Sequence, residues 1–336
     1  MRRVTAAFAI AVFSICAMSV ASAADKQWKQ VEKYTLGGDG GWDYLRFDPA
    51  GNRLFIAHGD RYEVVDAASG KKTGEVRSDG AHGVALVQEK GRGFSANGRA
   101  GTVTVFDLKT LKPIQDIKVG EGPDAVSYDP HSKMVLVMNH RGKEISVIDP
   151  DAMKVVQTIP LGGTLEEAVT DAGHVYVNVE DTSEIAVVDS KTWKPTSRWK
   201  LEGCDGASAL SIDEINERLF ATCETKKMFV VNANTGAVVA TVPTGSGTDG
   251  GGWDPGLHVA FASNGEGTLT IVKQDSPDKY SVLQNLTTER GARTMTVDPK
   301  THRVYTVSAD FGPPAEGQRR PSVKPDTFRL LVYAPE

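Results

Sequence analysis

Short apolar runs recur along the chain, four to a unit, with turn residues between them. In the unit that begins near Pro123, the runs read "DAVSYD", "MVLVMN", "EISVID" and "VVQTIP". They are rich in Val and Ile and are bounded by Gly, Pro, Asp and Asn, as is typical of β-strands joined by tight turns. No 3.6-residue period runs through a unit, which argues against a helical solenoid. The pattern therefore predicts an all-β chain.

Two polar markers show that the unit repeats roughly every 40 residues. The first ends the third run of a unit and recurs after 41, 42, 40 and 43 residues, at Asp66, Asp107, Asp149, Asp189 and Asn232. The second ends the first run, at Asp48, Asp129, Asp171, Asp213, Asp254 and Asp298. Four antiparallel strands with this repeat length are typical of a β-propeller blade. We predict a seven-bladed β-propeller with blades that begin near Asp43, Ala81, Pro123, Glu166, Ala207, Gly252 and Arg293.

The seventh unit lacks a fourth strand of its own. It stops after the third run, "FRLLVYAPE", and an open sheet edge invites unwanted pairing. The segment Gln27–Gly38, "QWKQVEKYTLGG", reads like the fourth strand of the other units. We therefore predict that this segment pairs with Phe328–Ala334 and closes the ring.

The first 23 residues have the composition of a secretory signal peptide. Arg2 and Arg3 precede the apolar run "AAFAIAVFSICAMSV", and small residues follow at Ala21–Ala23. A membrane anchor is the alternative, although the run is short for a span. We expect cleavage near Ala23–Ala24, a single propeller domain over residues 24–336, a monomer, and a periplasmic or secreted location.

Export would change the net charge of the mature chain and would place its cysteines in an oxidising compartment. Removal of residues 1–23 takes two of the 38 basic side chains and none of the 43 acidic ones, which leaves a formal charge of −7. A general nucleic-acid surface would be basic, so nucleic acid is not an expected partner. Cys204 and Cys223 remain, at one end of a predicted hairpin. An oxidising compartment permits a disulfide between them, and two reduced thiols are the alternative.

The phrases around the third runs resemble a known family. "VTVFDLKT", "ISVIDPDA", "IAVVDSKT" and "MFVVNANTG" are similar to the repeats of the YVTN-type, YncE-like exported seven-bladed propellers. The YVTN tetrapeptide itself is approximated at Val175–Asn178 and Val304–Val307. The GH…WD signature of WD40 propellers is absent. The resemblance implies an exported propeller from a family with many members of unassigned reaction, and it raises single-stranded DNA binding as an alternative function.

Loops of variable length join the predicted blades, and such loops on a rigid scaffold are where binding normally occurs. We predict ligand-binding residues there at Trp42, Asp43, Asp124, Glu166, Trp253 and Arg293. His82 and His140 are the candidates for moving a proton, because imidazole titrates near neutral pH. Packing, ion pairing and loop hydrogen bonds are the alternative roles for these side chains.

Acidic side chains that converge on one opening attract cations. Glu167, Asn139 and Asp205 offer oxygen ligands of the kind that Ca²⁺ or Mg²⁺ prefers, so we predict a divalent-ion site there. The alternative is that these side chains bond loop amides and face solvent. No G-x-S-x-G, H-E-x-x-H or P-loop motif occurs.

Three functions remain open. The first choice is a protein that binds a small polar ligand, a peptide or an envelope partner at the channel mouth. The second is a metal-assisted hydrolase or lyase, by analogy with lactonases. In that case Glu167 and Asp205 would hold the metal, and His82 or His140 would move the proton. The third is single-stranded DNA binding, against which the acidic mouth argues.

Overall fold

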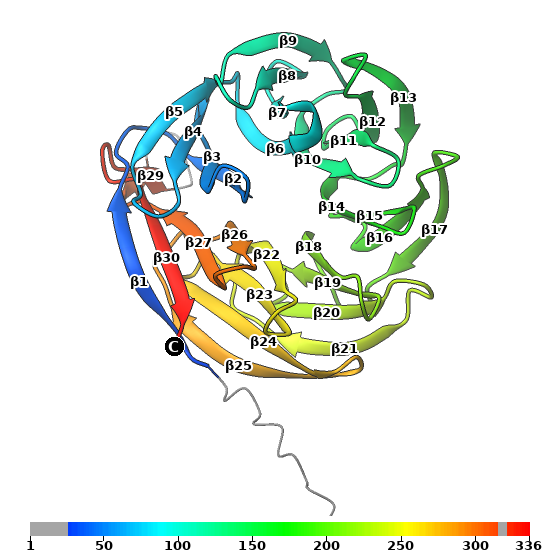
Figure 1. Ribbon diagram of the computed structural model, residues 1–336. Coiled ribbons are helices and arrows are strands. Elements are labelled where there is room, and N and C mark those ends of the chain that lie inside the picture. The colour runs from blue at the N-terminus through cyan, green and yellow to red at the C-terminus, as the bar shows by residue number, and fades with distance from the viewer. Residues whose placement is uncertain (1–25, 315–320) are drawn as a thin grey trace, which may run out of the picture.

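The molecule is built from seven four-stranded antiparallel sheets that surround a central channel as the blades of a β-propeller (Figure 1). The computed structural model describes residues 26–314 and 321–336, and the predicted signal peptide lies outside them. The first strand of each blade is innermost and the fourth is outermost. The predicted fold class is confirmed.

The strands of the first four blades follow one another in order along the chain. Blade 1 has β2 (Trp42–Asp48), β3 (Arg53–His58), β4 (Arg61–Asp66) and β5 (Lys72–Arg77). Blade 2 has β6 (Ala81–Val87), β7 (Arg92–Asn97), β8 (Thr102–Asp107) and β9 (Pro113–Lys118), with a 3₁₀ turn η1 (Gln88–Lys90). Blade 3 has β10 (Pro123–Asp129), β11 (Met134–Asn139), β12 (Glu144–Asp149) and β13 (Lys154–Pro160). Blade 4 has β14 (Leu165–Asp171), β15 (His174–Val179), β16 (Glu184–Asp189) and β17 (Lys194–Lys200).

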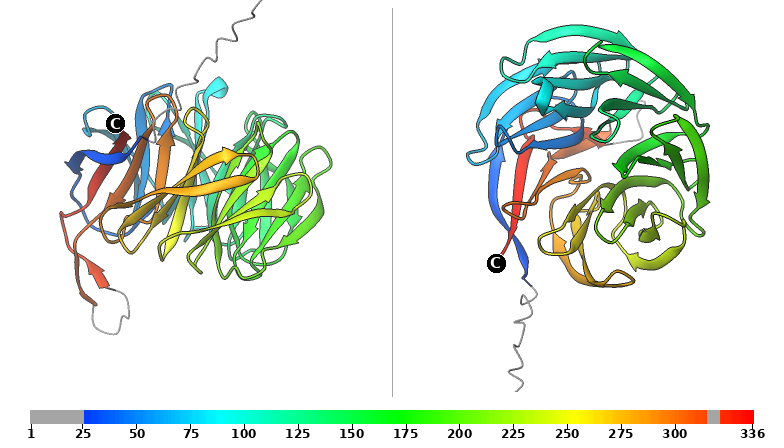
Figure 2. Two further views of the ribbon diagram at one scale, coloured as in Figure 1. Left: turned by 90° about the horizontal axis from the view of Figure 1, so that it is seen from below. Right: turned by 45° about the vertical axis from the view of Figure 1, so that its right-hand side comes forward.

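The last three blades include the junction of the two chain ends. Blade 5 has β18 (Ala207–Asp213), β19 (Arg218–Cys223), β20 (Lys227–Asn232) and β21 (Val238–Pro243). Blade 6 has β22 (Thr248–Asp254), β23 (Val259–Asn264), β24 (Thr268–Ser276) and β25 (Lys279–Thr287). Blade 7 has β26 (Met295–Asp298), β27 (Arg303–Ser308), β30 (Arg329–Pro335) and β1 (Trp28–Thr35). A hairpin of β28 (Phe311–Pro314) and β29 (Pro321–Val323) stands out from one face beside this blade (Figure 2).

The sixth blade begins earlier than its sequence predicts. β22 starts at Thr248, four residues before the expected Gly252. The intervening "TDGG" conceals the strand because Asp and Gly are depleted in strands. β26, by contrast, starts two residues after the expected Arg293.

The N-terminal strand closes the ring as predicted. β1 pairs antiparallel with β30, so that Lys33 lies opposite Leu331. The strand also contacts blade 6, because the ring of Trp28 packs edge-on against Phe261 at 5.6 Å between centroids. The backbone N–H of Trp28 donates to Oε1 of Gln284 at 2.8 Å. The borrowed strand therefore joins the last blade and ties it to its neighbour.

The core lies between neighbouring blades. Val135 and Val137 of β11 pack toward blade 2, whereas Leu136 and Met138 pack toward blade 4. Side chains that alternate along a strand thus find an apolar neighbour on both faces. This accounts for the continuous apolar runs of the inner strands.

The repeated acids are turn residues. Asp48 accepts hydrogen bonds from the backbone N–H groups of Ala50 at 3.1 Å and Gly51 at 3.2 Å. In the turn between the third and fourth strands of blade 2, Asp107 accepts hydrogen bonds from the backbone N–H groups of Lys109 and Thr110. A carboxylate at the start of a tight turn satisfies amides that the sheet leaves free. The acids that mark the repeat therefore stabilise the turns between strands.

Cys204 and Cys223 form a disulfide, as predicted. It links the loop before β18 to the end of β19, with 5.6 Å between the two Cα atoms. A bridge over a sequence separation of 19 residues stabilises the fold by roughly 3 kcal/mol in the chain-entropy treatment. Within the described ranges, no helix has the length and apolar character needed to cross a membrane.

Candidate functional site

A break in strand pairing recurs at the start of the innermost strand in six of the seven blades. In blade 1 the register shifts between Trp42 and Leu45, so Asp43 and Tyr44 lie in a β-bulge. The same shift occurs at the start of β6, β10, β14, β18 and β22. A bulge re-aims the side chains that it contains. In register order, with Arg293 at the corresponding place before β26, the seven positions are Asp43, His82, Asp124, Glu166, Ser208, Asp249 and Arg293.

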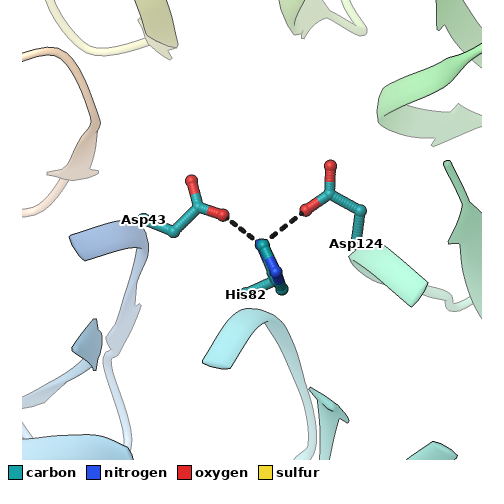
Figure 3. Close-up of side chains that lie close together, drawn as sticks. All are labelled: Asp43, His82 and Asp124. Atoms are coloured by element: carbon teal, nitrogen blue, oxygen red, sulfur yellow. Dashed lines mark hydrogen bonds and ion pairs between the residues drawn. The ribbon is translucent and has the colours of Figure 1, made fainter. Parts of the chain in front are cut away.

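Five of these side chains form an arc of alternating charge. The guanidinium of Arg293 lies between two acids, with Nε 2.7 Å from Oδ2 of Asp249 and Nη2 3.9 Å from Oδ1 of Asp43. His82 lies between the next two, with Nδ1 2.5 Å from Oδ2 of Asp43 and 3.1 Å from Oδ1 of Asp124 (Figure 3). Acids from blades 6, 1 and 3 are thus joined by cations from blades 7 and 2.

His140 extends the arc to blade 4. It follows β11, and its Nδ1 lies 2.9 Å from Oε1 of Glu166 and 3.8 Å from Oδ2 of Asp124. The carbonyl oxygen of Leu165 lies 3.2 Å from the same nitrogen. Asp124 therefore stands between two histidines and presents one carboxylate oxygen to each.

The arc borders a cavity of about 240 Å³. Its lining includes Asp43, His82, Asp124, His140, Glu166 and Asp249. Asp124 and Glu166 are recessed and the histidines more accessible: 14% of the Asp124 side chain and 13% of Glu166 are exposed, against 38% of His82 and 34% of His140. A ligand that enters from solvent meets imidazoles backed by carboxylates.

His82 is held in its charged form. Burial alone would lower its pKa, but the interactions with Asp124 and Asp43 outweigh burial and raise the pKa to about 10. Burial raises the pKa of Asp124, and the interaction with His82 opposes that rise. His82 is therefore an imidazolium at neutral pH and is poorly suited to act as a general base.

Burial has the strongest effect on the remaining acids. It raises the pKa of Glu166 to about 8, against the opposing bond from His140. The bond to Glu166 in turn raises the pKa of His140, so these two groups titrate as a pair. Asp249 has a pKa raised to about 6 by burial among the mouth side chains, although 35% of its side chain is exposed and Arg293 opposes the rise.

The two predicted tryptophans do not line this cavity together. Trp42 is 5% exposed and packs against Phe328 at 5.6 Å, with its Nε1 donating to the carbonyl oxygen of Gly291. Trp253 stacks on Phe220 at 5.0 Å and lines a separate cavity of about 260 Å³. Trp42 thus has the contacts of a packing residue, whereas Trp253 lines a cavity, and ligand binding by either stays a prediction.

The three side chains predicted to hold Ca²⁺ or Mg²⁺ have different surroundings. Glu167 lines the 260 Å³ cavity and accepts the backbone N–H of Leu210 at 3.1 Å. Asn139 is buried, and its side-chain amide donates to Oγ of Ser146 at 2.9 Å. Asp205 is exposed in the loop that carries the disulfide. In the described part of the chain, the histidine and carboxylate groups close enough to hold an ion include neither Glu167 nor Asp205.

Sequence reasoning offers ion pairing as an alternative role for Asp43 and Arg293 but does not identify the partners across the blades. It gives Asp249 no role. Alignment of the units on the bulge would have shown a charged or titratable residue at this position in six of seven blades. Alignment on the bulge position is therefore the sequence signal that could have identified these residues as a group.

Comparisons with known proteins address the fold. No protein-family model matches the chain, and no curated protein matches its sequence. Among solved structures, the chain is similar to hydrazine synthase of Kuenenia stuttgartiensis, with a TM-score of 0.66 and 17% identity. The match covers 82% of this chain and 94% of that one. At this identity the likeness concerns the propeller fold alone.

Proposed function

We propose that the protein is an exported propeller that binds a small cationic ligand at the channel mouth. The disulfide supports export, because such bonds persist in oxidising compartments. A periplasmic or secreted location and the YVTN-type, YncE-like affiliation belong to the same proposal, supported by the N-terminal composition and by the repeated phrases.

The charge balance of the arc is the observation that carries the proposal. Its members are the acids Asp43, Asp124, Glu166 and Asp249 and the cations His82, His140 and Arg293. Once Glu166, whose pKa is about 8, has ionised, one carboxylate stays uncompensated, and a low-dielectric cleft of one sign attracts counter-ions. A volume of about 240 Å³ holds roughly eight water molecules, so the ligand is small.

The proposal predicts a preference for cations over anions of equal size. The chelator-treated full chain is titrated with primary amines and diamines, and with carboxylic acids of matching length, by isothermal titration calorimetry. We expect the amines to bind and Asp124→Asn to weaken them at least tenfold, because the variant removes the acid that both histidines face. Asp205→Asn, at an exposed site, is the matched control. Tighter binding of the acids would contradict the proposal.

A metal-assisted hydrolase or lyase is the second candidate function. Histidine and carboxylate side chains at the mouth form two groups close enough to ligate an ion. Turnover of lactones by the metal-loaded protein is the measurement that decides between binding and hydrolysis. The acidic mouth gives single-stranded DNA binding no support.

A further inference from the structure

The two histidines at the mouth belong to two ligand groups that share one acid. Asp43, His82 and Asp124 form the first group, and Asp124, His140 and Glu166 form the second. In each group, one nitrogen or oxygen from every residue lies within 4.8 Å of the other two. The shared residue is Asp124, which belongs to the first strand of blade 3.

One atom of the first group has no hydrogen-bond donor of its own. Nδ1 of His82 carries a single hydrogen and donates it to Oδ2 of Asp43 at 2.5 Å. Oδ1 of Asp124 is buried and lies 3.1 Å from the same nitrogen, as an ion pair without a second hydrogen bond (Figure 3). A buried carboxylate oxygen without a donor is costly. The single proton on Nδ1 cannot form a full hydrogen bond to both carboxylates. A metal cation placed between the nitrogen and the two carboxylate oxygens would contact all three atoms.

The second group uses the other oxygen of the shared acid. Oδ2 of Asp124 faces Nδ1 of His140 at 3.8 Å, and Oε1 of Glu166 faces the same nitrogen at 2.9 Å. The carbonyl oxygen of Leu165, 3.2 Å from that nitrogen, is a further oxygen donor. The two carboxylate oxygens of Asp124 thus point into different groups.

We propose that the mouth binds two divalent transition-metal ions, one in each group, bridged by the two carboxylate oxygens of Asp124. This rests on the proposed function and names its cation. Each ion would take one imidazole nitrogen and two carboxylate oxygens from the protein. That donor set suits Zn²⁺, Mn²⁺, Fe²⁺ or Co²⁺, whereas Ca²⁺ and Mg²⁺ take oxygen ligands. Binding releases the protons that the imidazole nitrogens hold.

The stoichiometry of metal binding tests the bridge. The chelator-treated full chain is titrated with Mn²⁺ by calorimetry, and its electron paramagnetic resonance spectrum is recorded at each ratio. We expect two equivalents to bind with a proton release that depends on the buffer. At two equivalents the spectrum should show spin coupling, because one carboxylate joins the two ions.

Single substitutions separate the two groups. His82→Gln should leave one uncoupled equivalent in the second group, and His140→Gln should leave one in the first. Asp124→Asn should weaken both equivalents at least tenfold. Asp205→Asn, which alters an exposed acid outside both groups, should keep two coupled equivalents.

Several results would overturn the proposal. They are no Mn²⁺ bound at micromolar concentration, one equivalent only, or two equivalents without spin coupling. Circular dichroism and the melting temperature of each variant identify any loss of fold, and the two histidine variants decide the question if Asp124→Asn does not fold. Amine binding without metal binding would sink this inference and leave the proposed function intact.

Discussion

Acids occupy two kinds of equivalent position in the blades, the turns and the channel mouth, and the protein treats them in opposite ways. Hydrogen bonds from Ser69 lower the pKa of Asp66 in its turn, and bonds from Thr110 do the same for Asp107. At the mouth, burial raises the pKa of Glu166 to about 8. Asp66 and Asp107 are thus stabilised as carboxylates, whereas burial disfavours the carboxylate form of Glu166.

The two kinds of position also differ in how far they repeat. The turn position at the end of the first strand is Asp in six blades, and in five of them the carboxylate accepts a backbone N–H of its own turn. The mouth position changes from blade to blade between acid, histidine, serine and arginine. Uniformity across the repeats marks what the fold needs. Divergence on a uniform scaffold is what we expect at a binding site, and it agrees with the function proposed for the mouth.

The largest effect that we predict is at a turn. Asp254 is fully buried, accepts the backbone N–H of Gly256 at 2.9 Å and lies 2.8 Å from Nδ1 of His302. Asp254→Ala should lower the free energy of unfolding by about 3 kcal/mol, because buried donors lose their acceptor. Urea denaturation measures the change, with the exposed Asp205→Ala as control at under about 0.5 kcal/mol. A loss below about 1 kcal/mol would contradict the claim that the fold depends on the acids at its turns.

At the channel wall, removal of an acid should have the opposite effect and raise the free energy of unfolding. Burial raises the pKa of Glu167 to about 7, above its ordinary value of 4.5. An acid with a raised pKa in the folded state destabilises the fold increasingly as pH rises from 4.5 to 7, because the folded state must then ionise it. Glu167→Gln removes that cost and keeps an oxygen for the N–H of Leu210.

The variant should therefore be more stable than the native protein at pH 8, by on the order of 2 kcal/mol. Below pH 4.5, where both side chains are neutral, the difference should vanish. Urea denaturation between pH 4 and pH 8 gives the profile. Equal stabilities across this range would mean that Glu167 is hydrated in the native state.

Local signals explain why the fold was predictable. Turn acids such as Asp48, strand-length apolar runs and a spare strand at Gln27–Gly38 are all visible in the sequence, and together they fix the blade count and the closure. The pairing of Cys204 with Cys223 followed from the hairpin that they flank. Each of these inferences depends only on residues within one blade, or on the number of blades in the ring.

The mouth required more than that. His82 and Asp124 line one cavity, but their contact joins blades 2 and 3 and depends on a β-bulge that residue types alone do not predict. Glu167 follows Glu166 in the same bulge and projects into another cavity. One step along a bulged strand thus separates a mouth acid from a channel acid, and Glu167 is therefore absent from the ligand groups at the mouth.

The finest test concerns the single arginine of the arc. Arg293 lies 2.7 Å from Asp249 and opposes the rise that burial imposes on the pKa of that acid, which stands at about 6. Arg293→Gln should raise the pKa of Asp249 further, by about one unit, because an opposite charge at contact distance favours ionisation. Carboxyl ¹³C chemical shifts across a pH titration report it, with Asp66 as an internal control whose low pKa should not move. An unchanged value at Asp249 would show that solvent screens this pair, and the arc would then end at Asp43 instead of spanning blades 6 and 7.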